Sequence, residues 1–280
     1  MATAYQIPNL PKEYEVKIVC DSVSKAGARL TTFVCTYPRF IHAEVMTHRM
    51  LSKNVASSRA IPIEKMIDRV MNNPAMPAFW GKNQKGMQAF EEAEQDVIDQ
   101  AKKSWLHARD IAVEWAKRMN ELGIHKQIAN RLVEPFMLTT VIITGTEWEN
   151  FFALRNSESA QPEFACMAKR MQELYEAGIV QEGLGSMWHL PLLTEGEKLD
   201  PEAPLISAAR CARISYLKLD PKSREEEIEL AKTLIKKKHM SPFEHQAKEL
   251  KRADRRSGNF FGWKQFRKTI AGENVGRRMD

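Results

Sequence analysis

Three stretches of the chain have the composition and periodicity of β-strands. Residues 14–20 alternate between apolar and polar side chains, which is the pattern of a strand with one buried face. Residues 29–36 are rich in β-branched and aromatic side chains, and residues 137–145 form an equally clear apolar run. The sequence therefore predicts strands at 14–20 and 29–36, and a strand or a buried apolar segment at 137–145.

Other stretches repeat apolar residues every three or four positions, as amphipathic helices do. The segment after Pro38 keeps this spacing and predicts a helix through about residue 53. Ser159 is a candidate N-cap for another helix, with Pro162 and Glu163 in its first turn. Further helices are predicted over residues 63–71, 88–121, 147–154, 204–215 and 223–238.

The segments between these elements suggest how the chain is organised. Residues 72–87 are rich in Pro, Gly and Asn and predict a loop, while the Gly and Pro residues of 178–200 predict a linker. Residues 251–280 form a basic tail with an aromatic group at 259–263 that we expect to pack against the protein. Without an internal repeat, we expect a single domain over residues 1–280.

The overall composition, with 43% hydrophobic and 28% charged residues, is that of a globular protein. No apolar run approaches the roughly 20 residues that cross a bilayer, and the first residues lack the pattern of a secretory signal. We therefore expect a cytoplasmic protein with no membrane partner. The net charge of +6 favours an anionic partner, either a nucleic acid or a nucleotide-like small molecule.

The four cysteines are dispersed and show no metal-ligand spacing. Cys20 and Cys35 lie in predicted strands, where a buried reduced thiol is the usual finding. We therefore expect no metal site and no cysteine nucleophile.

The densest group of polar side chains lies between residues 47 and 59. In the predicted helix, His48 and Ser52 would share one face. Beyond it follow two hydroxyls and a guanidinium, the donor set that a phosphate monoester needs, at Ser57, Ser58 and Arg59. On these residues alone the segment is either an exposed polar helix end or an anion-binding site.

This segment resembles the motif of the flavin-dependent thymidylate synthases, which is Arg-His-Arg, seven residues, then Ser. His48, Arg49 and Ser57 match the motif, whereas Thr47 stands at the position of the first Arg. The resemblance implies that His48 and Arg49 contact the flavin. It also implies that the nucleotide is held by Ser57, Ser58 and Arg59.

A second set of segments, 131–135, 150–155 and 160–163, is similar to further motifs of that family. The resemblance assigns Arg131 to the nucleotide, Asn150 to the flavin, and Arg155 to both nucleotide binding and activation of the pyrimidine. The last role has a physical basis, because uracil C5 attacks more easily once N3 loses its proton. A guanidinium beside N3 and O4 stabilises the resulting anion.

A third match lies outside the family's usual order. Residues 208–216 and 239–245 are similar to the family segments Ala-Arg-Ile-Ser-Tyr and His-x-Ser-Pro-Phe-Glu-His, which normally precede the His-Arg motif. The resemblance places Ser241 at the flavin phosphates and His239 on the folate or nicotinamide side of the flavin. We infer a circular permutation in which the N-terminal family segment has moved to the C-terminus, with 178–200 at the join.

Several positions depart from the family pattern. Val55 stands where Glu is usual, and Thr144 and Thr146 stand where Asn and Arg are usual. Glu44 replaces a Gln near the nucleotide, and a carboxylate is able to read the amino group of cytosine. Basic residues available to restore the lost positive charge are Lys53, Lys237, Lys238 and those of 251–256.

The resemblance implies a fold and a reaction. The fold is an α+β arrangement in which a small mixed sheet packs with long helices. The reaction is reductive methylation of dUMP to dTMP in a homotetramer, with FAD as cofactor and NADPH and 5,10-methylenetetrahydrofolate as co-substrates. This flavin route needs no cysteine nucleophile, in agreement with the setting of the four cysteines.

Two other functions fit parts of the sequence. A dUMP or dCMP hydroxymethylase would use the same one-carbon transfer but let water quench the intermediate. A nucleic-acid-binding protein would use the basic clusters and would bind DNA with a steep salt dependence. The motif matches favour the enzyme, so we do not expect nucleic acid as the partner.

Overall fold

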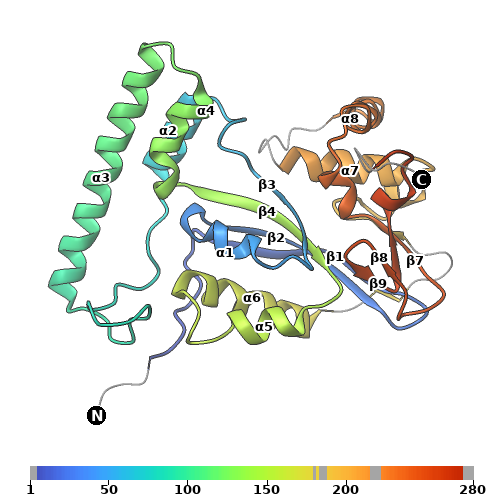
Figure 1. The fold of residues 1–280 in the computed structure, drawn as a ribbon, viewed down its shortest axis with the longest axis horizontal. Helices are drawn as coiled ribbons and strands as arrows, with labels where there is room; N and C mark the ends of the chain where they lie inside the picture. Colours follow the sequence, from blue (N-terminus) through green and yellow to red (C-terminus); the bar gives the residue numbers. More distant parts are fainter. Residues whose placement is uncertain (1–4, 179–180, 183–187, 215–221, 274–280) are drawn as a thin grey trace, which may run out of the picture.

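The computed structural model describes residues 5–178, 181–182, 188–214 and 222–273. Its centre is a five-stranded sheet with the strand order β3-β4-β2-β1-β5, antiparallel except for the parallel pair β1 and β5 (Figure 1). The strands are β1 (Glu15–Val23), β2 (Arg29–Pro38), β3 (Ser52–Val55), β4 (Leu138–Gly145) and β5 (Gln181–Glu182). The three predicted strands and the small mixed sheet are confirmed.

Helices cover both faces of this sheet because its central strands are apolar on both sides. Phe33 and Tyr37 of β2 pack in one core with α6 (Pro162–Ala177) and α5 (Glu149–Arg155). Val34, which points to the opposite face, packs with Cys211 of α7 (Ala203–Ile214). Successive side chains of a strand alternate between the two faces of the sheet, so β2 packs against both layers of helices.

A second hydrophobic core joins the helices beside the β3 edge of the sheet. It contains buried side chains such as Met66 of α2 and Val113 of α3. The elements that form it are α2 (Ile63–Asn72), α3 (Gln95–Glu121), α4 (Lys126–Ala129) and the 3-10 segment η2 (Asn130–Phe136). This lobe positions Arg131 and Glu134, which become important below.

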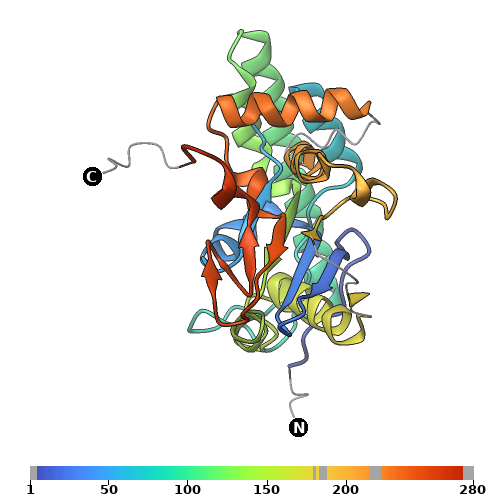
Figure 2. The ribbon, with the colours of Figure 1, turned by 90° about the vertical axis from the view of Figure 1, so that its right-hand side faces the viewer.

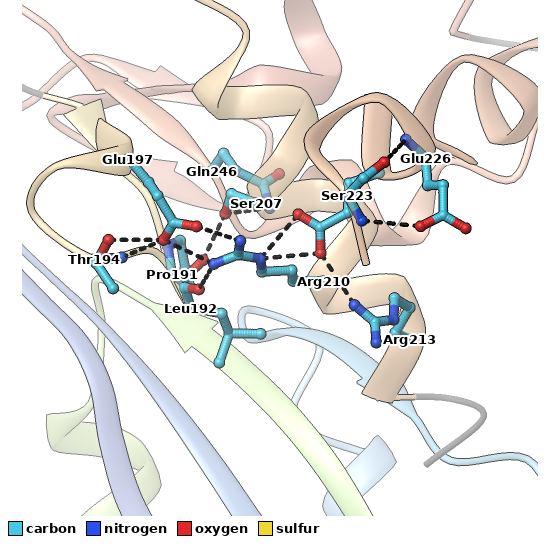
Figure 3. A network of polar contacts seen from close by, with 11 residues as sticks. Pro191, Leu192, Thr194, Glu197, Ser207, Arg210, Arg213, Ser223, Glu226 and Gln246 are labelled. Carbon is cyan, nitrogen blue, oxygen red and sulfur yellow. Dashed lines mark hydrogen bonds and ion pairs between the residues drawn. The ribbon is translucent and has the colours of Figure 1, made fainter. Parts of the chain in front are cut away.

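The C-terminal part contains α7, α8 (Arg224–Lys236) and the 3-10 segments η3 (Glu197–Leu199), η4 (Ser241–Glu244) and η5 (Phe266–Thr269). The Arg210 guanidinium joins three of these pieces (Figure 3). It donates to Glu197 Oε2 at 2.9 Å and to the buried Glu227 at 3.1 Å, and Arg213 donates to Glu227 Oε1 at 3.0 Å. The described residues of 188–200 are thus packed onto α7 and α8, while their role as a permutation join stays a prediction.

The tail also packs against the protein, as expected. It contributes to a three-stranded sheet and a two-stranded one, which lie beside the N-terminal strands in Figure 2. Phe260 and Trp263 are fully buried against Leu30, and Trp263 Nε1 donates to Ala28 O at 3.0 Å. The strands are β6 (Trp188–His189), β7 (Ala247–Glu249), β8 (Arg256–Ser257), β9 (Phe260–Phe261) and β10 (Trp263–Gln265). Residues 274–280 of the predicted tail lie outside the described residues, as do Ser215 and Tyr216 of the family segment.

The predicted helix over 38–53 is wrong. The segment forms a short 3-10 turn η1 (Arg39–Ile41) and a five-residue helix α1 (His42–Met46), and then returns as β3. Ser52–Val55 pair with β4, so sheet hydrogen bonds override the helical spacing of the apolar residues. As a result His48 and Ser52 do not share a helix face, and Ser52 is buried beneath Gln265, whose amide donates to it at 3.1 Å.

Two helix starts also differ from the prediction. The long helix begins at Gln95 rather than 88, because residues 91–93 fold back on Trp80 and Lys82 through backbone hydrogen bonds. The helix α6 begins at Pro162 with Gln161 as its N-cap, so Ser159 is not the cap. The helices predicted at 63–71, 147–154, 204–215 and 223–238 are present within one or two residues over their described parts. Within the part of the chain that the structure describes, no helix is both long and apolar enough to span a membrane.

Candidate active site

Arg155, the last residue of α5, joins residues more than 100 positions away in the sequence. Its Nε donates to His48 Nε2 at 2.8 Å, its Nη1 to Glu44 Oε2 at 3.3 Å and its Nη2 to Thr47 Oγ1 at 3.4 Å. Its Cζ lies 4.7 Å from the centre of the Phe164 ring, a cation–π contact. The structure thus places the residue predicted to activate the pyrimidine next to the His-Arg motif.

His48 is held as a neutral imidazole. Burial, the Arg155 charge and the Lys53 charge lower the pKa of His48 to about 4. Its ring packs edge-on against Phe151 and Phe164 at 4.9 and 5.9 Å. Because Nε2 accepts from Arg155, a neutral His48 carries its proton on Nδ1. The Arg155 cation is therefore hydrogen-bonded to a neutral His48 ring, and no repulsion between two positive charges arises.

Arg155 lines two different cavities. The smaller, about 280 Å³, brings together His48, Arg49, Asn150 and Arg155. The larger, about 750 Å³, is a cleft with aromatic walls and a polar end. The cleft is lined by Phe40, Phe79 and Trp105 and by the polar residues Glu44, Arg155, Ser159, Gln161 and Glu163, among others. Arg155 is the residue shared by both.

The residues predicted to hold the nucleotide do not all reach these two cavities. Ser58 is buried and donates to Glu134 Oε1 at 2.5 Å, and Arg131 Nη1 donates to the same oxygen at 2.8 Å. Ser57 is half-buried and Arg59 is exposed, and neither lines a cavity around Arg155 within this chain. Arg131 lines a third cavity of about 380 Å³, which is also lined by Phe40.

Ser241 and His239 lie on a different wall. Both residues are exposed, and η4 packs against β3 so that Ser241 Oγ donates to Asn54 Oδ1 at 3.3 Å. Neither lines the cavity that holds His48 and Asn150. The segment that contains Ser241 nevertheless lies beside the motif strand, although Ser241 and Asn54 are 187 positions apart in the sequence.

The two threonines at unusual positions have partners in the structure. Thr144 Oγ1 is 2.8 Å from both Thr32 Oγ1 and His245 Nδ1. Thr146 Oγ1 accepts from Phe261 N of the tail at 3.2 Å. The tail therefore contacts the position where the family usually has an Arg.

Several site residues were not found from the sequence pattern as functional positions. Glu163 is buried, and its carboxylate accepts from Ala78 N at 2.8 Å. Burial raises the pKa of Glu163, and the neighbouring Glu44 adds to that effect. Phe79 lies in the predicted loop 72–87, and Trp105 lies in the long helix α3. An aromatic residue in such a segment predicts packing in a core, so the sequence did not indicate that these two side chains line a cavity.

The cysteines are buried and reduced, as expected. Burial raises the pKa of the Cys166 thiol to about 12 and also raises the pKa values of Cys20, Cys35 and Cys211. A thiol with a raised pKa is a poor nucleophile at neutral pH. Within the described ranges, no three His, Cys, Asp or Glu side chains form a group that could hold a metal ion.

The geometry is that of a small-molecule site, with aromatic walls, two cations and a neutral imidazole converging on adjoining cavities. The chain belongs to the thymidylate synthase complementing protein family, whose sequence pattern matches residues 28–178. The family resemblance predicted from the motifs is confirmed. The match ends before the segments at 208–216 and 239–245, so the circular permutation stays a prediction.

Solved structures similar to this chain include two of the UMP/dUMP methylase PolB from Streptomyces cacaoi. The one bound with 5-Br UMP is 18% identical, with 61% of this chain and 92% of that chain covered and a TM-score of 0.48. The one bound with 5-Br dUMP is 17% identical, with 60% and 92% covered and a TM-score of 0.47. No curated protein matches the sequence.

Proposed function

We propose that this protein is a flavin-dependent enzyme that transfers a one-carbon unit to C5 of a pyrimidine nucleotide, and that its reaction is reductive methylation of dUMP to dTMP. The observation that carries the proposal is the position of Arg155. Its side chain donates hydrogen bonds to His48 and Glu44 and lines two cavities. Membership of the thymidylate synthase complementing family supports the proposal.

The residues around the smaller cavity fit a flavin in their chemistry. A flavin ring needs hydrogen-bond donors at its pyrimidine edge, and a dinucleotide needs cations at its phosphates. Arg49 and Asn150 are exposed donors in the same cavity as His48, so these three residues would hold part of FAD. Ser241 and His239 would contact it from the η4 wall. When bound, FAD supplies the redox chemistry, with NADPH as reductant and 5,10-methylenetetrahydrofolate as carbon donor.

Arg155 would bind and activate the base in the larger cleft. Its side chain is only 21% exposed, so its charge acts in a partly desolvated site where electrostatic effects are strengthened. A guanidinium donates hydrogen bonds and stabilises negative charge on N3 and O4 of uracil without giving up a proton. The hydrogen bond that Arg155 donates to His48 and the cation–π contact with the Phe164 ring hold the guanidinium in place before substrate enters.

The proposed assignments in the nucleotide site include Glu44, Ser57, Ser58, Arg59 and Arg131. Glu44 lies beside Arg155 in the cleft, whereas Ser58 and Arg131 meet at Glu134. Because Ser57 and Arg59 do not line the cleft of their own chain, we propose that they complete the cleft of a second copy in a homotetramer. The exposed apolar side chains of Val97, Ile111 and Trp115 on α3 offer a surface for such assembly, and light scattering of the purified protein measures its size.

A second candidate function, hydroxymethylation of dUMP or dCMP, is favoured by Glu44. A carboxylate next to a guanidinium presents an acceptor beside a donor, which matches the 4-amino group and N3 of cytosine. The same pair also fits N3–H and O4 of uracil. The base and the fate of the transferred carbon therefore have to be measured together.

The test is a spectrum followed by a product assay. The purified protein should be yellow, or should become so when loaded with FAD. Incubated with NADPH and methylenetetrahydrofolate, it should then convert dUMP to dTMP, which mass spectrometry separates from a hydroxymethyl product. A hydroxymethyl nucleotide would select the second candidate. A colourless protein that binds DNA with a steep salt dependence, and modifies neither dUMP nor dCMP, would show that the proposal is wrong.

A further inference from the structure

The third cavity, of about 380 Å³, shares the side chain of Phe40 with the aromatic cleft. Phe40 lines both, so a ligand with a ring in one and a charged group in the other would pass around this side chain. The cavity is lined by Arg39, Phe40, His42, Ala43, Arg131, Glu134 and Pro135. Arg131 was assigned to the nucleotide by resemblance, whereas Arg39 belongs to none of the motifs.

Arg39 has an unusual environment for an arginine. Its Nη1 is shielded from solvent and has no hydrogen-bond partner, and no carboxylate of the described residues forms an ion pair with it. A partly desolvated guanidinium without a counter-charge destabilises the protein, because the shielded nitrogen has lost its hydrogen bonds to water and forms none with the protein. An anion in the cavity would supply the missing partner.

The charges around Arg39 leave the cavity positive. Among the residues that the structure describes, Glu134 is the only carboxylate that lines it, and one of its oxygens already accepts hydrogen bonds from Ser58 and Arg131. His42 is neutral near pH 7, since burial and the charges of Arg39 and Lys53 lower the pKa of His42 to about 4. Two guanidiniums therefore face one carboxylate. The pair of Arg131 and Glu134 is an i,i+3 contact with a half-exposed arginine, so an incoming anion can compete for it at low cost.

We propose that Arg39 and Arg131 together bind the phosphate of the nucleotide substrate, whose base lies across Phe40 beside Arg155. This inference rests on the proposed function and adds to it a binding residue, Arg39, that the family motifs do not contain. A guanidinium forms two parallel hydrogen bonds to phosphate oxygens, so Arg39 gives selectivity for a nucleotide over the corresponding nucleoside.

The test compares dUMP with deoxyuridine on the FAD-loaded protein by isothermal titration. The wild-type protein should bind dUMP more tightly than deoxyuridine, and Arg39→Met should reduce dUMP affinity by about 10- to 100-fold, the range for one charge-assisted contact. The affinity for deoxyuridine should not change, and Arg39→Lys should recover part of the loss. Arg118→Met removes an exposed arginine of α3 outside the cavity and should leave both affinities unchanged. An unchanged ratio in Arg39→Met would overturn the inference.

A second measurement separates this inference from the proposed function. If neither dUMP nor deoxyuridine binds, the proposed function fails, but inorganic phosphate still probes the cavity. Phosphate should raise the melting temperature of the wild-type protein above that in chloride of equal ionic strength, and should not do so for Arg39→Met. Equal shifts in both proteins would refute the phosphate site. Because Arg39 makes no side-chain hydrogen bond in the described structure, Arg39→Met should melt close to the wild type without phosphate.

Discussion

Two polar networks built around histidines cross this protein, and they differ in charge and in access to solvent. The first joins Arg155, His48, Glu44 and Thr47 on the α5–α6 side of the sheet, next to two cavities. The second is a chain of uncharged groups that crosses the sheet from Ser22 to His245 through His189, Thr32 and Thr144. Every residue of the second network is buried.

The contrast shows how to separate a functional histidine from a structural one. Burial lowers the pKa of His189 and His245 to about 3, as burial and neighbouring cations lower that of His48 to about 4. A depressed pKa is therefore common to both networks and distinguishes neither. The difference is that the His48 network contains a charge and lines cavities. The His245 network pairs buried hydroxyls with imidazole nitrogens inside the sheet and joins the sheet to the C-terminal part, although His245 Nε2 itself has no hydrogen-bond partner.

The largest expected effect is on turnover when the charged network loses its cation. Arg155→Ala should lower kcat by at least about 100-fold, as loss of a preorganised electrostatic contact does, while bound flavin is retained. Steady-state kinetics and the flavin absorbance measure the two quantities. Arg155→Lys keeps the charge but not the fork of donors and should recover only part of the rate. Loss of the flavin in Arg155→Ala would mean that the arginine binds the cofactor instead.

The same kind of change in the neutral network should affect stability and leave the chemistry intact. Thr144→Val removes the hydroxyl between Thr32 and His245 and should lower the free energy of unfolding by about 1–3 kcal/mol, the cost of buried groups left unpaired. Urea denaturation measures it. The matched control is Thr140→Val on the same strand, which breaks a half-buried contact with Thr36 and should cost less. A large fall in kcat with unchanged stability would place Thr144 in the active site.

The pH dependence of stability should follow from the neutral histidines of both networks. Their pKa values in the folded protein lie below the ordinary 6.5, so the unfolded chain takes up protons first as the pH falls. The contribution of the neutral histidines to the free energy of unfolding is complete above pH 6.5. It is lost progressively as the pH falls toward 4 and below. Urea titrations between pH 7 and pH 4 should show a falling midpoint, and His245→Gln should make the fall shallower. A midpoint that rises toward pH 4 would contradict this account.

The smallest expected effect is on catalysis when a thiol is removed. Cys166→Ala should change kcat by less than about twofold, because the high pKa of this buried thiol makes it a poor nucleophile and the proposed flavin route does not need one. Product formation per folded enzyme measures the effect. Complete loss of activity in a folded Cys166→Ala protein would contradict the proposed route without a cysteine nucleophile. It would favour a cysteine-based mechanism like that of the cysteine-using thymidylate synthases.

The sequence predicted the elements with strong periodicity and failed where tertiary pairing competes with it. The strands at 29–36 and 137–145 and the helix at 63–71 have their expected types because their apolar patterns agree with their packing. The apolar spacing predicts a helix from Pro38 through about residue 53, but Ser52–Val55 complete the edge of the sheet beside β4. The periodicity of a few residues carries no information about hydrogen bonds to a strand more than 80 positions away in the sequence.

The candidate site divides in the same way. The motif residues and their chemistry were readable from the sequence by itself, since His48, Arg49, Asn150 and Arg155 carry side chains whose types specify what they can bind. Only the tertiary structure decided that they share one cavity, that Ser58 and Arg131 meet at Glu134, and that Arg39 has a buried nitrogen without a partner. The reason is that charge and donor type belong to each residue, whereas desolvation and proximity depend on where the whole chain places it.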